Sequence, residues 1–169
     1  MKEIISQASV NDLPDIMTMI KACIKNMNEN GITQWNEQYP PRKIFLQDIE
    51  NKSLFKFAIN SNLVGIIVLS PVQDEEYEDI AWNDQNGKYL VVHRMAVHPN
   101  WQRRGIASKL LDFAEKFAKE QRYTSIRIDT FSKNPRTLSL FSKRNFERKA
   151  GEIHFPENIE PYYCYELLL

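Results

Sequence analysis

The sequence predicts a mixed α/β or α+β fold, a sheet with helices on both of its faces. Short runs rich in β-branched and aromatic residues are bounded by turn residues, as strands are. Between them lie segments whose apolar residues recur at helical spacing. The order along the chain is strand, two helices, three strands, helix, strand, helix and a closing strand pair. That order favours one layered α/β domain.

A first strand is expected over residues 4–8, and a helix should follow it. Asn11 or Asp12 supplies the N-cap, and Pro14 suits the first helical turn. The helix should end before Gly31. Its core-facing stripe consists of Leu13, Ile16, Met17, Ile20, Cys23, Ile24 and Met27.

The next stretch predicts a second helix and a hairpin. The helix begins near Pro41 and continues through Ile49. The β-rich runs 55–59 and 64–69 then flank Asn60, Ser61 and Asn62, which are typical turn residues. An acidic loop should follow the hairpin.

The second half of the chain begins with a central strand over residues 90–97. Pro99 ends this strand, because proline cannot donate to a sheet ladder. A long amphipathic helix follows, and its stripe is Ile106, Leu110, Phe113, Ala114, Phe117 and Ala118. Further elements are a strand over 125–130, a short helix over 135–143 and a closing strand pair over 147–155 and 162–168.

Length and composition point to one ordinary core. With 169 residues and 43% apolar content, a single domain over residues 1–169 is expected. No apolar run suits a signal peptide or a bilayer span, so we expect a cytoplasmic protein without a membrane partner. A homodimer is compatible with the sequence.

Cysteine and histidine usage predicts neither a disulfide nor a metal site. Cys23 falls on the stripe of the first helix and Cys164 in the last strand, so both are expected to be small core residues. The scattered His93, His98 and His154 have no metal-ligand spacing.

The turn between the central strand and the long helix is the most informative segment. A helix start leaves its first amides unpaired and carries partial positive charge. Gly105 lets a diphosphate approach the backbone, and Arg103 and Arg104 add positive charge. The amides that can point at the anion are those of Arg104, Gly105, Ile106, Ala107 and Ser108. The sequence therefore predicts a phosphate-binding cradle; the alternative is an ordinary turn with solvated arginines.

Gln102, Gly105 and Ala107 resemble the acyl-CoA-binding motif of the GNAT superfamily of N-acetyltransferases. That motif reads Gln or Arg, two residues, Gly, one residue, then Gly or Ala. A second match is Asn134 followed by residues 140–146, which are similar to the family's Asn and later Leu-Tyr, three residues, Gly-Phe. The order of elements also matches, so the resemblance covers nearly the whole chain.

The resemblance implies a mostly antiparallel central sheet whose central strands splay apart, with acetyl-CoA as the acyl donor. The pantetheine arm would pair with the backbone of the central strand. The residues implied at the coenzyme, besides the cradle, are Met95, Ala96, Val97, Asn134, Phe141 and Arg144. Phe141 stands where the family often has the Tyr that protonates the departing thiolate, and Asn145 stands where it usually has Gly.

The resemblance further implies transfer of an acetyl group to a primary amine of a small molecule or peptide. Candidate catalytic bases are His93, Asp129 and, through water, a loop carboxylate such as Glu76. The alternative for His93 is a hydrogen-bonded histidine within a strand. The alternative for Asp129 is a residue that caps a segment or pairs with Arg127 or Arg94.

An acceptor pocket is expected where aromatic residues gather between the first two helices and near the closing strands. Its candidate residues are Trp35, Tyr39, Trp82 and Tyr162, with Tyr163 nearby. Such rings can clamp an amine by cation–π contact, or they can be ordinary core packing. The acidic loop over residues 74–84 would steer a cationic acceptor, or it is a solvated loop.

Two other function classes compete with the transferase. A regulatory module that binds CoA without transferring the acyl group is favoured by Phe141. A nucleic-acid-binding domain is suggested by residues 100–150, which hold more than half of the 22 Lys and Arg residues. The aromatic residues of that segment lie on apolar stripes and form no stacking array, so no nucleic-acid partner is expected.

Overall fold

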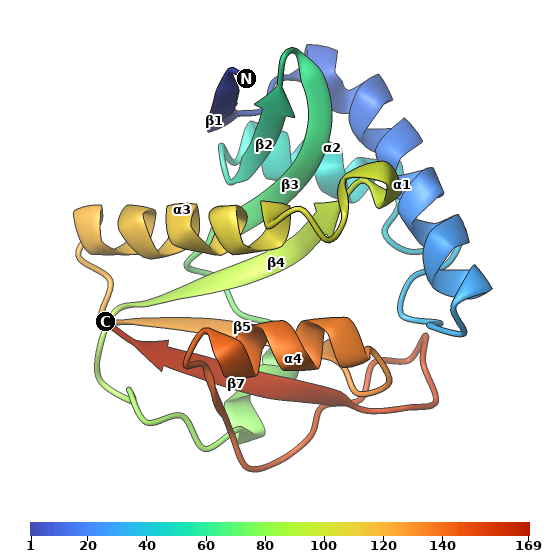
Figure 1. Ribbon diagram of the computed structural model, residues 1–169. Helices are drawn as coiled ribbons and strands as arrows, with labels where there is room; N and C mark the ends of the chain where they lie inside the picture. The colour runs from blue at the N-terminus through green and yellow to red at the C-terminus, as the bar shows by residue number, and fades with distance from the viewer. The chain divides into compact units, whose positions relative to one another are not determined.

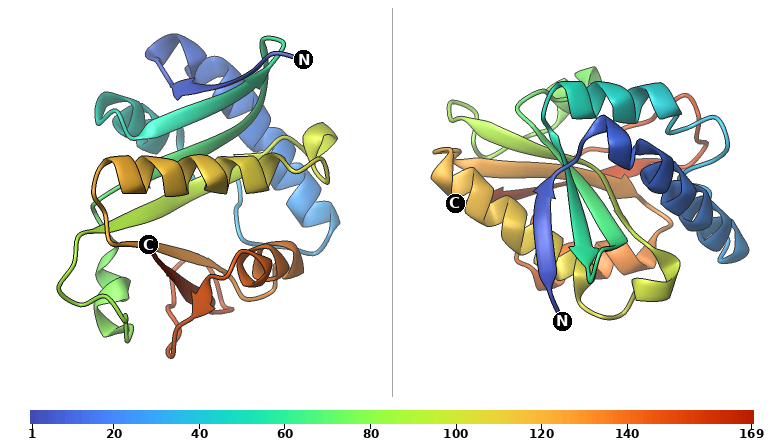
Figure 2. Two further views of the ribbon diagram at one scale, coloured as in Figure 1. Left: turned by 60° about the vertical axis from the view of Figure 1, so that its left-hand side comes forward. Right: turned by 90° about the horizontal axis from the view of Figure 1, so that it is seen from above.

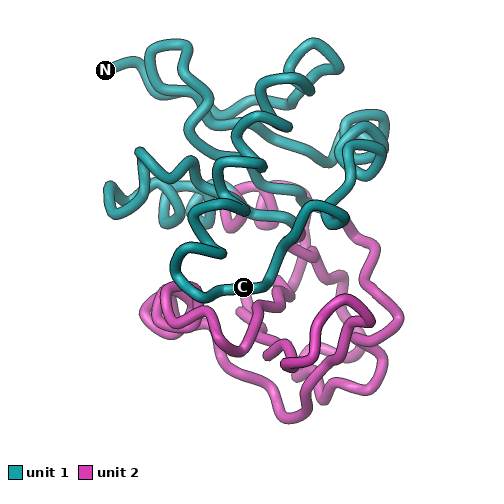
Figure 3. The backbone as a smooth tube through the Cα atoms, turned by 90° about the vertical axis from the view of Figure 1, so that its right-hand side faces the viewer, with its two compact units in different colours: residues 1–69, 94–113 teal, residues 70–93, 114–169 magenta.

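The computed structural model describes residues 1–169, and the chain forms two compact units. Unit 1 comprises residues 1–69 and 94–113, and unit 2 comprises residues 70–93 and 114–169 (Figure 3). Strand β4 (Tyr89–Val97) and helix α3 (Ile106–Glu120) are each divided between the units. The second part of β4 and the first part of α3 belong to unit 1, and their other parts belong to unit 2. The elements are labelled in Figure 1.

Unit 1 is built on antiparallel strands. It contains β1 (Glu3–Gln7), β2 (Leu54–Ile59) and β3 (Asn62–Ser70), with helices α1 (Leu13–Glu29) and α2 (Arg42–Glu50) between the first two strands. β1 pairs antiparallel with β2, and β2 pairs antiparallel with β3. The hairpin between β2 and β3 turns through Asn60 and Ser61, whose φ angles of 48° and 68° are those of a two-residue turn with left-handed central residues.

Helices cover both faces of the unit 1 strands (Figure 2). α1 and α2 bury their apolar stripes in one cluster with residues of β2, β3 and β4. Its buried members are Leu13, Ile16, Met19, Ile20, Cys23, Trp35, Phe45, Ile49, Leu54, Ile66, Val68 and Ala96. On the opposite face the first half of α3 packs close, since Phe113 meets Phe55 at a ring distance of 5.0 Å. A Cβ at Gly65 would lie 3.1 Å from Leu110, so glycine permits this approach.

Unit 2 combines parallel and antiparallel pairing. Its strands are the first half of β4, β5 (Ser125–Phe131), β6 (Glu147–Arg148) and β7 (Tyr162–Leu168), and its helix is α4 (Pro135–Lys143). β4 and β5 are parallel, whereas β5 and β7, and β6 and β7, are antiparallel. The strand order is β1-β2-β3-β4-β5-β7-β6. The predicted mixed α+β sheet is therefore confirmed.

Most predicted elements are confirmed within a residue or two of their ends. Asp12 is the N-cap of α1, as predicted. The strand predicted over 147–155 is wrong beyond its first two residues, because β6 ends at Arg148 and only an isolated bridge joins Ile153 to Tyr162. Gly151, at φ 97°, gives this segment a backbone conformation that a strand does not have.

Both cysteines are buried and free, as predicted. None of the helices combines the length and the apolar character that crossing a bilayer would require.

Candidate functional site

The cradle predicted from the sequence lies in unit 1, in the turn before α3. Arg103 and Gly105 have φ angles of 61° and 78°, so the backbone changes hand around Arg104. Successive peptide groups of alternating hand turn their N–H bonds toward a common concave side, which suits an anion. A Cβ placed on Gly105 would meet nothing within 4 Å, so the space beside these amides is open.

The start of α3 adds further amides to the cradle. The first helical hydrogen bond runs from Lys109 N to Gly105 O at 3.0 Å. The amides of Ile106, Ala107 and Ser108 precede it and have no acceptor within the helix. Their partial positive charge favours a phosphate group.

The charged side chains of this turn are exposed. Arg103 and Arg104 face solvent, and the Arg104 guanidinium lies 5.0 Å from the centre of the Trp101 ring. The charge of Lys109 is neutralised, because its ammonium group lies 2.6 Å from the Glu3 carboxylate. Among the charged side chains of this turn, the two arginines therefore add to the partial positive charge of the amides.

Gln102, predicted to bind the coenzyme, directs its side chain at the preceding strand. Its Nε2 donates to the Val97 carbonyl at 3.2 Å, and the Cys23 thiol donates to the same oxygen at 3.4 Å. Burial raises the pKa of the Cys23 thiol to about 12, so the thiol keeps its proton. Any contribution of Gln102 to the cradle is therefore expected from its main chain.

The end of β4 presents a strand edge. His98 N donates to Val64 O at 2.9 Å, so the peptide groups of residues 98 and 96 face β3. By strand alternation, those of Met95 and Val97 face the opposite edge. The register between β4 and β5 runs from Tyr89↔Ser125 to Val92↔Ile128. The pairing of Met95–Val97 with pantetheine remains a prediction.

The two candidate bases lie in unit 2. His93 Nε2 is 2.9 Å from the Val72 carbonyl, and Nδ1 is 4.0 Å from the Asp74 carboxylate. A carbonyl only accepts, so Nε2 carries the proton of the neutral ring and Nδ1 carries the lone pair. The side chain is 10% exposed, so the ring is held rather than freely rotating.

Asp129 accepts a hydrogen bond from the Tyr77 hydroxyl at 2.5 Å. Burial, together with the neighbouring Asp129 carboxylate, raises the pKa of Tyr77 well above its usual range, so the phenol remains a neutral donor. The guanidinium groups suggested as partners of Asp129, those of Arg127 and Arg94, bind other groups.

Tyr77 belongs to a short helical turn over Glu75–Asp79 that is tied to the strands by aromatic contacts. Trp82 Nε1 donates to the Tyr77 carbonyl at 2.9 Å, and the two rings are 5.3 Å apart. The Arg127 guanidinium lies between the rings of Trp82 and Tyr89, at 4.5 and 3.8 Å from their centres. These contacts fix the donor of Asp129 in place.

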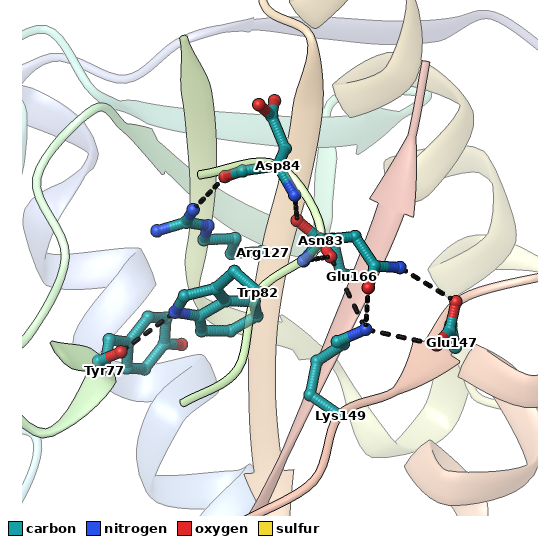
Figure 4. A network of polar contacts seen from close by, with 8 residues as sticks. All are labelled: Tyr77, Trp82, Asn83, Asp84, Arg127, Glu147, Lys149 and Glu166. Atoms are coloured by element: carbon teal, nitrogen blue, oxygen red, sulfur yellow. Dashed lines mark hydrogen bonds and ion pairs between the residues drawn. The ribbon is translucent and has the colours of Figure 1, made fainter. Parts of the chain in front are cut away.

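A buried polar network holds the following residues of this loop (Figure 4). The Glu166 carboxylate, 2% exposed, accepts the main-chain amides of Asn83 and Asp84 at 2.7 and 3.0 Å. The Lys149 ammonium group lies 2.8 Å from Asn83 Oδ1 and 3.8 Å from Glu166. The buried Glu166 carboxylate therefore binds loop 82–84 to β7.

Three residues predicted at the coenzyme lie on or near α4. Asn134 caps this helix, its Oδ1 accepting from Thr137 N at 3.5 Å. The Arg144 guanidinium lies 2.6 Å from the Glu115 carboxylate. Phe141 is 1% exposed and packs edge-on against Tyr165 at 5.4 Å. Contacts of Asn134, Phe141 and Arg144 with a coenzyme remain predictions.

The aromatic residues predicted to line an acceptor pocket divide between the units. Trp35 is 8% exposed within the unit 1 core, and Tyr39 packs against the same cluster. In unit 2, Tyr162 stacks edge-on against Phe155 at 4.9 Å, while Trp82 belongs to the cluster around Tyr77. Each contributes to packing within its own unit, and an acceptor pocket remains a prediction.

Two residues of interest were not singled out from the sequence. Tyr77 is the aromatic residue of an otherwise acidic run, and that contrast was a usable signal. Asp48 lies on the buried face of α2 beside Phe45 and Ile49 and binds Arg94. A carboxylate on an apolar helical stripe also signals a buried partner.

Known proteins share features of this sequence. A model of the family described as Acetyltransferase (GNAT) family matches residues 20–146. The uncharacterized N-acetyltransferase YesJ of Bacillus subtilis (strain 168) is 21% identical over 142 residues, which cover 83% of this chain and 79% of YesJ.

Solved structures share the fold. A GNAT-family acetyltransferase from Streptococcus agalactiae 2603 has a TM-score of 0.84 at 23% identity, covering 99% of this chain and 95% of its own. The PaiA N-acetyltransferase of Thermoplasma acidophilum, in complex with coenzyme A, has a TM-score of 0.76 at 16% identity, covering 100% of both chains. With a family match over most of its length and this shared fold, the chain belongs to the acetyltransferase (GNAT) family of N-acetyltransferases.

Proposed function

We propose that this N-acetyltransferase moves an acetyl group from acetyl-CoA to a primary amine of a small molecule or peptide. The main-chain geometry of residues 103–108 carries the proposal. Left-handed residues at 103 and 105 and the open start of α3 direct amides to one side, where the coenzyme pyrophosphate would bind. The complex of the similarly folded PaiA with coenzyme A supports this choice of donor.

The transfer is a direct attack on the thioester. The amine nitrogen forms a bond to the carbonyl carbon, the carbon–sulfur bond breaks, and the thiolate of CoA leaves. The attacking nitrogen gives up one proton, and we assign its acceptance to His93 Nδ1. Val72 supports this role, because its carbonyl holds the ring in the required tautomer. Asp129 is the second candidate base, and Tyr77 already occupies one of its oxygens.

Phe141 has no hydroxyl with which to protonate the thiolate. A thiol with a pKa of about 8.5 is a tolerable leaving group, and a general acid usually contributes about 100-fold to 10,000-fold in rate. The absence of tyrosine at this position therefore slows the transfer without preventing it. The proton taken up by His93 returns to solvent or to the thiolate.

Binding of the donor is tested at Gly105, with Gly31 as a matched control. Both glycines lie in unit 1, have φ angles of 78° and 71°, and would bring an added Cβ within 4 Å of no other group. Gly105→Ala and Gly31→Ala should therefore each cost about 1 kcal/mol of stability. Titration calorimetry with CoA should detect at least tenfold weaker binding only for Gly105→Ala, about 1.4 kcal/mol.

Unchanged CoA affinity in Gly105→Ala would remove the cradle from the proposal. Turnover is measured as free thiol released from acetyl-CoA with a panel of small and peptide amines. His93→Gln should lower the rate about 100-fold or more, since a lost general base has that effect. A larger loss in Asp129→Asn than in His93→Gln would transfer the role of base to Asp129.

A further inference from the structure

Arg94 has a backbone conformation that strands do not ordinarily contain. Its φ angle is 44°, inside β4, where a residue with a Cβ is strained. Such a conformation persists only where the surrounding structure enforces it, and it often marks a functional segment. The residue immediately precedes Met95–Val97, the edge proposed to meet pantetheine.

A buried ion pair holds the side chain of this strained residue. Arg94 Nε and Nη2 lie 2.7 and 2.8 Å from the two Asp48 oxygens, and the side chains are 16% and 10% exposed. Burial would lower the pKa of Arg94, but hydrogen bonds and charge from Asp48, with Tyr39, raise it above its usual value. A bidentate pair of this kind fixes the direction of the guanidinium as well as its position.

The same short segment is also held at its other end. The Val97 carbonyl accepts from Gln102 Nε2 and from the Cys23 thiol. In the middle, the Ala96 side chain is part of the core formed with α1 and α2. The segment Met95–Val97 is therefore constrained at both ends and at its centre, with the ion pair as its upstream anchor.

We propose that Asp48 and Arg94 are positioning residues that hold Met95–Val97 in the shape that pairs with the pantetheine arm. This inference rests on the proposed function. Pantetheine is an extended chain with two amide groups, so a strand edge recognises it as it would recognise another strand. A left-handed residue changes the direction of the peptide groups that follow it, and thus which amides face that edge.

Two double variants separate the backbone conformation from the charges. Asp48→Asn with Arg94→Gly and Asp48→Asn with Arg94→Ala both remove the two charges together, so no buried charge remains unpaired. They differ only at residue 94, where glycine adopts positive φ readily and alanine does not. Thermal unfolding establishes that both variants fold.

The probes are CoA and 3′-phospho-ADP, the nucleotide half of the coenzyme without its pantetheine arm. The measured quantity is the ratio of their dissociation constants. In the alanine double variant the preference for CoA should fall about tenfold, the value of roughly two lost hydrogen bonds. The glycine double variant should keep the native preference, and binding of 3′-phospho-ADP should be unchanged in both.

Equal preferences in the two double variants would overturn the inference. Native protein that binds both probes with equal affinity would also overturn it, while leaving the phosphate cradle intact. If the native protein binds neither probe, the proposed function itself fails and the inference fails with it. The single variant Asp48→Asn, which keeps Arg94, should give a preference between those of the native protein and the alanine double variant.

Discussion

The cradle over residues 103–108 and the network around Glu166 organise polar groups in opposite ways. The cradle consists of main-chain amides in open space, shaped by left-handed residues such as Gly105. The network consists of buried side chains, with Glu166 binding two loop amides and Lys149 beside it (Figure 4). Main-chain sites depend on backbone conformation, whereas buried side-chain networks depend on every charge being matched.

This difference predicts how each region responds to substitution. At the cradle, a change should alter ligand affinity with little effect on folding, because few buried groups depend on it. In the network, removing one charge leaves others buried without compensation, so stability should fall steeply. The variants below test that division, beginning with the largest expected effect.

Glu166→Gln should have the largest effect on stability. The carboxylate is 2% exposed, and its removal leaves the Lys149 ammonium group without one of its two anionic neighbours. A broken buried pair typically costs about 3–5 kcal/mol, which urea unfolding would measure. Glu147→Gln is the matched control, because Glu147 contacts the same lysine with a side chain that is 64% exposed. Similar losses in the two variants would contradict the steep response expected of a buried charge in the network.

The turn before α3 could be predicted from the sequence because a short motif encodes it, whereas anion binding there stays a prediction. Positive φ at a turn favours glycine, and Gly105 follows a strand and precedes a helix, so local residues suffice. The amphipathic stripes of α1 and α3 were likewise predictable, since their periodicity lies within one element. Such features depend on neighbours in sequence.

The network could not be predicted, because its partners are distant in the chain. Nothing local to Glu166 indicates that its oxygens bind amides of residues 83 and 84. Asp129 illustrates the same limit, as its hydrogen-bond donor Tyr77 comes from the loop before Trp82 and not from either arginine named as an alternative partner. The predicted strand over 147–155 was wrong for a different reason, because Gly151, inside that segment, adopts a φ angle of 97° that its apolar pattern does not indicate.

Tyr77→Phe should have an intermediate effect. It removes the hydroxyl that donates to the Asp129 carboxylate at 2.5 Å, and hydrogen bonds to charged groups contribute about 1.5–3 kcal/mol. Tyr162→Phe is the comparison, since its hydroxyl accepts from the neutral Asn158 amide at 2.8 Å and should cost about 0.5–1.5 kcal/mol. Urea unfolding measures both. A smaller loss for Tyr77→Phe would mean that Asp129 is well solvated without its donor.

Asp12→Asn should have the smallest effect, and only above acidic pH. Burial would raise the pKa of Asp12, but Lys56, at 2.5 Å, and the donors of Ser9 hold it below its usual value. A carboxyl whose pKa is lowered by folding stabilises the protein above its unfolded pKa of about 3.9 and loses that contribution as pH falls. At pH 7 the variant should therefore unfold at a slightly lower urea concentration. Its free energy of unfolding should fall by less than about 1 kcal/mol, because the ion pair is partly exposed. As pH falls below about 3.9 and through the lowered pKa of Asp12, the difference between the native protein and the variant should shrink. An equal difference at pH 7 and at pH 3 would show that the charge of Asp12 is not the source of its contribution, and the N-terminal cap of unit 1 would then depend on hydrogen-bond geometry, as the cradle does.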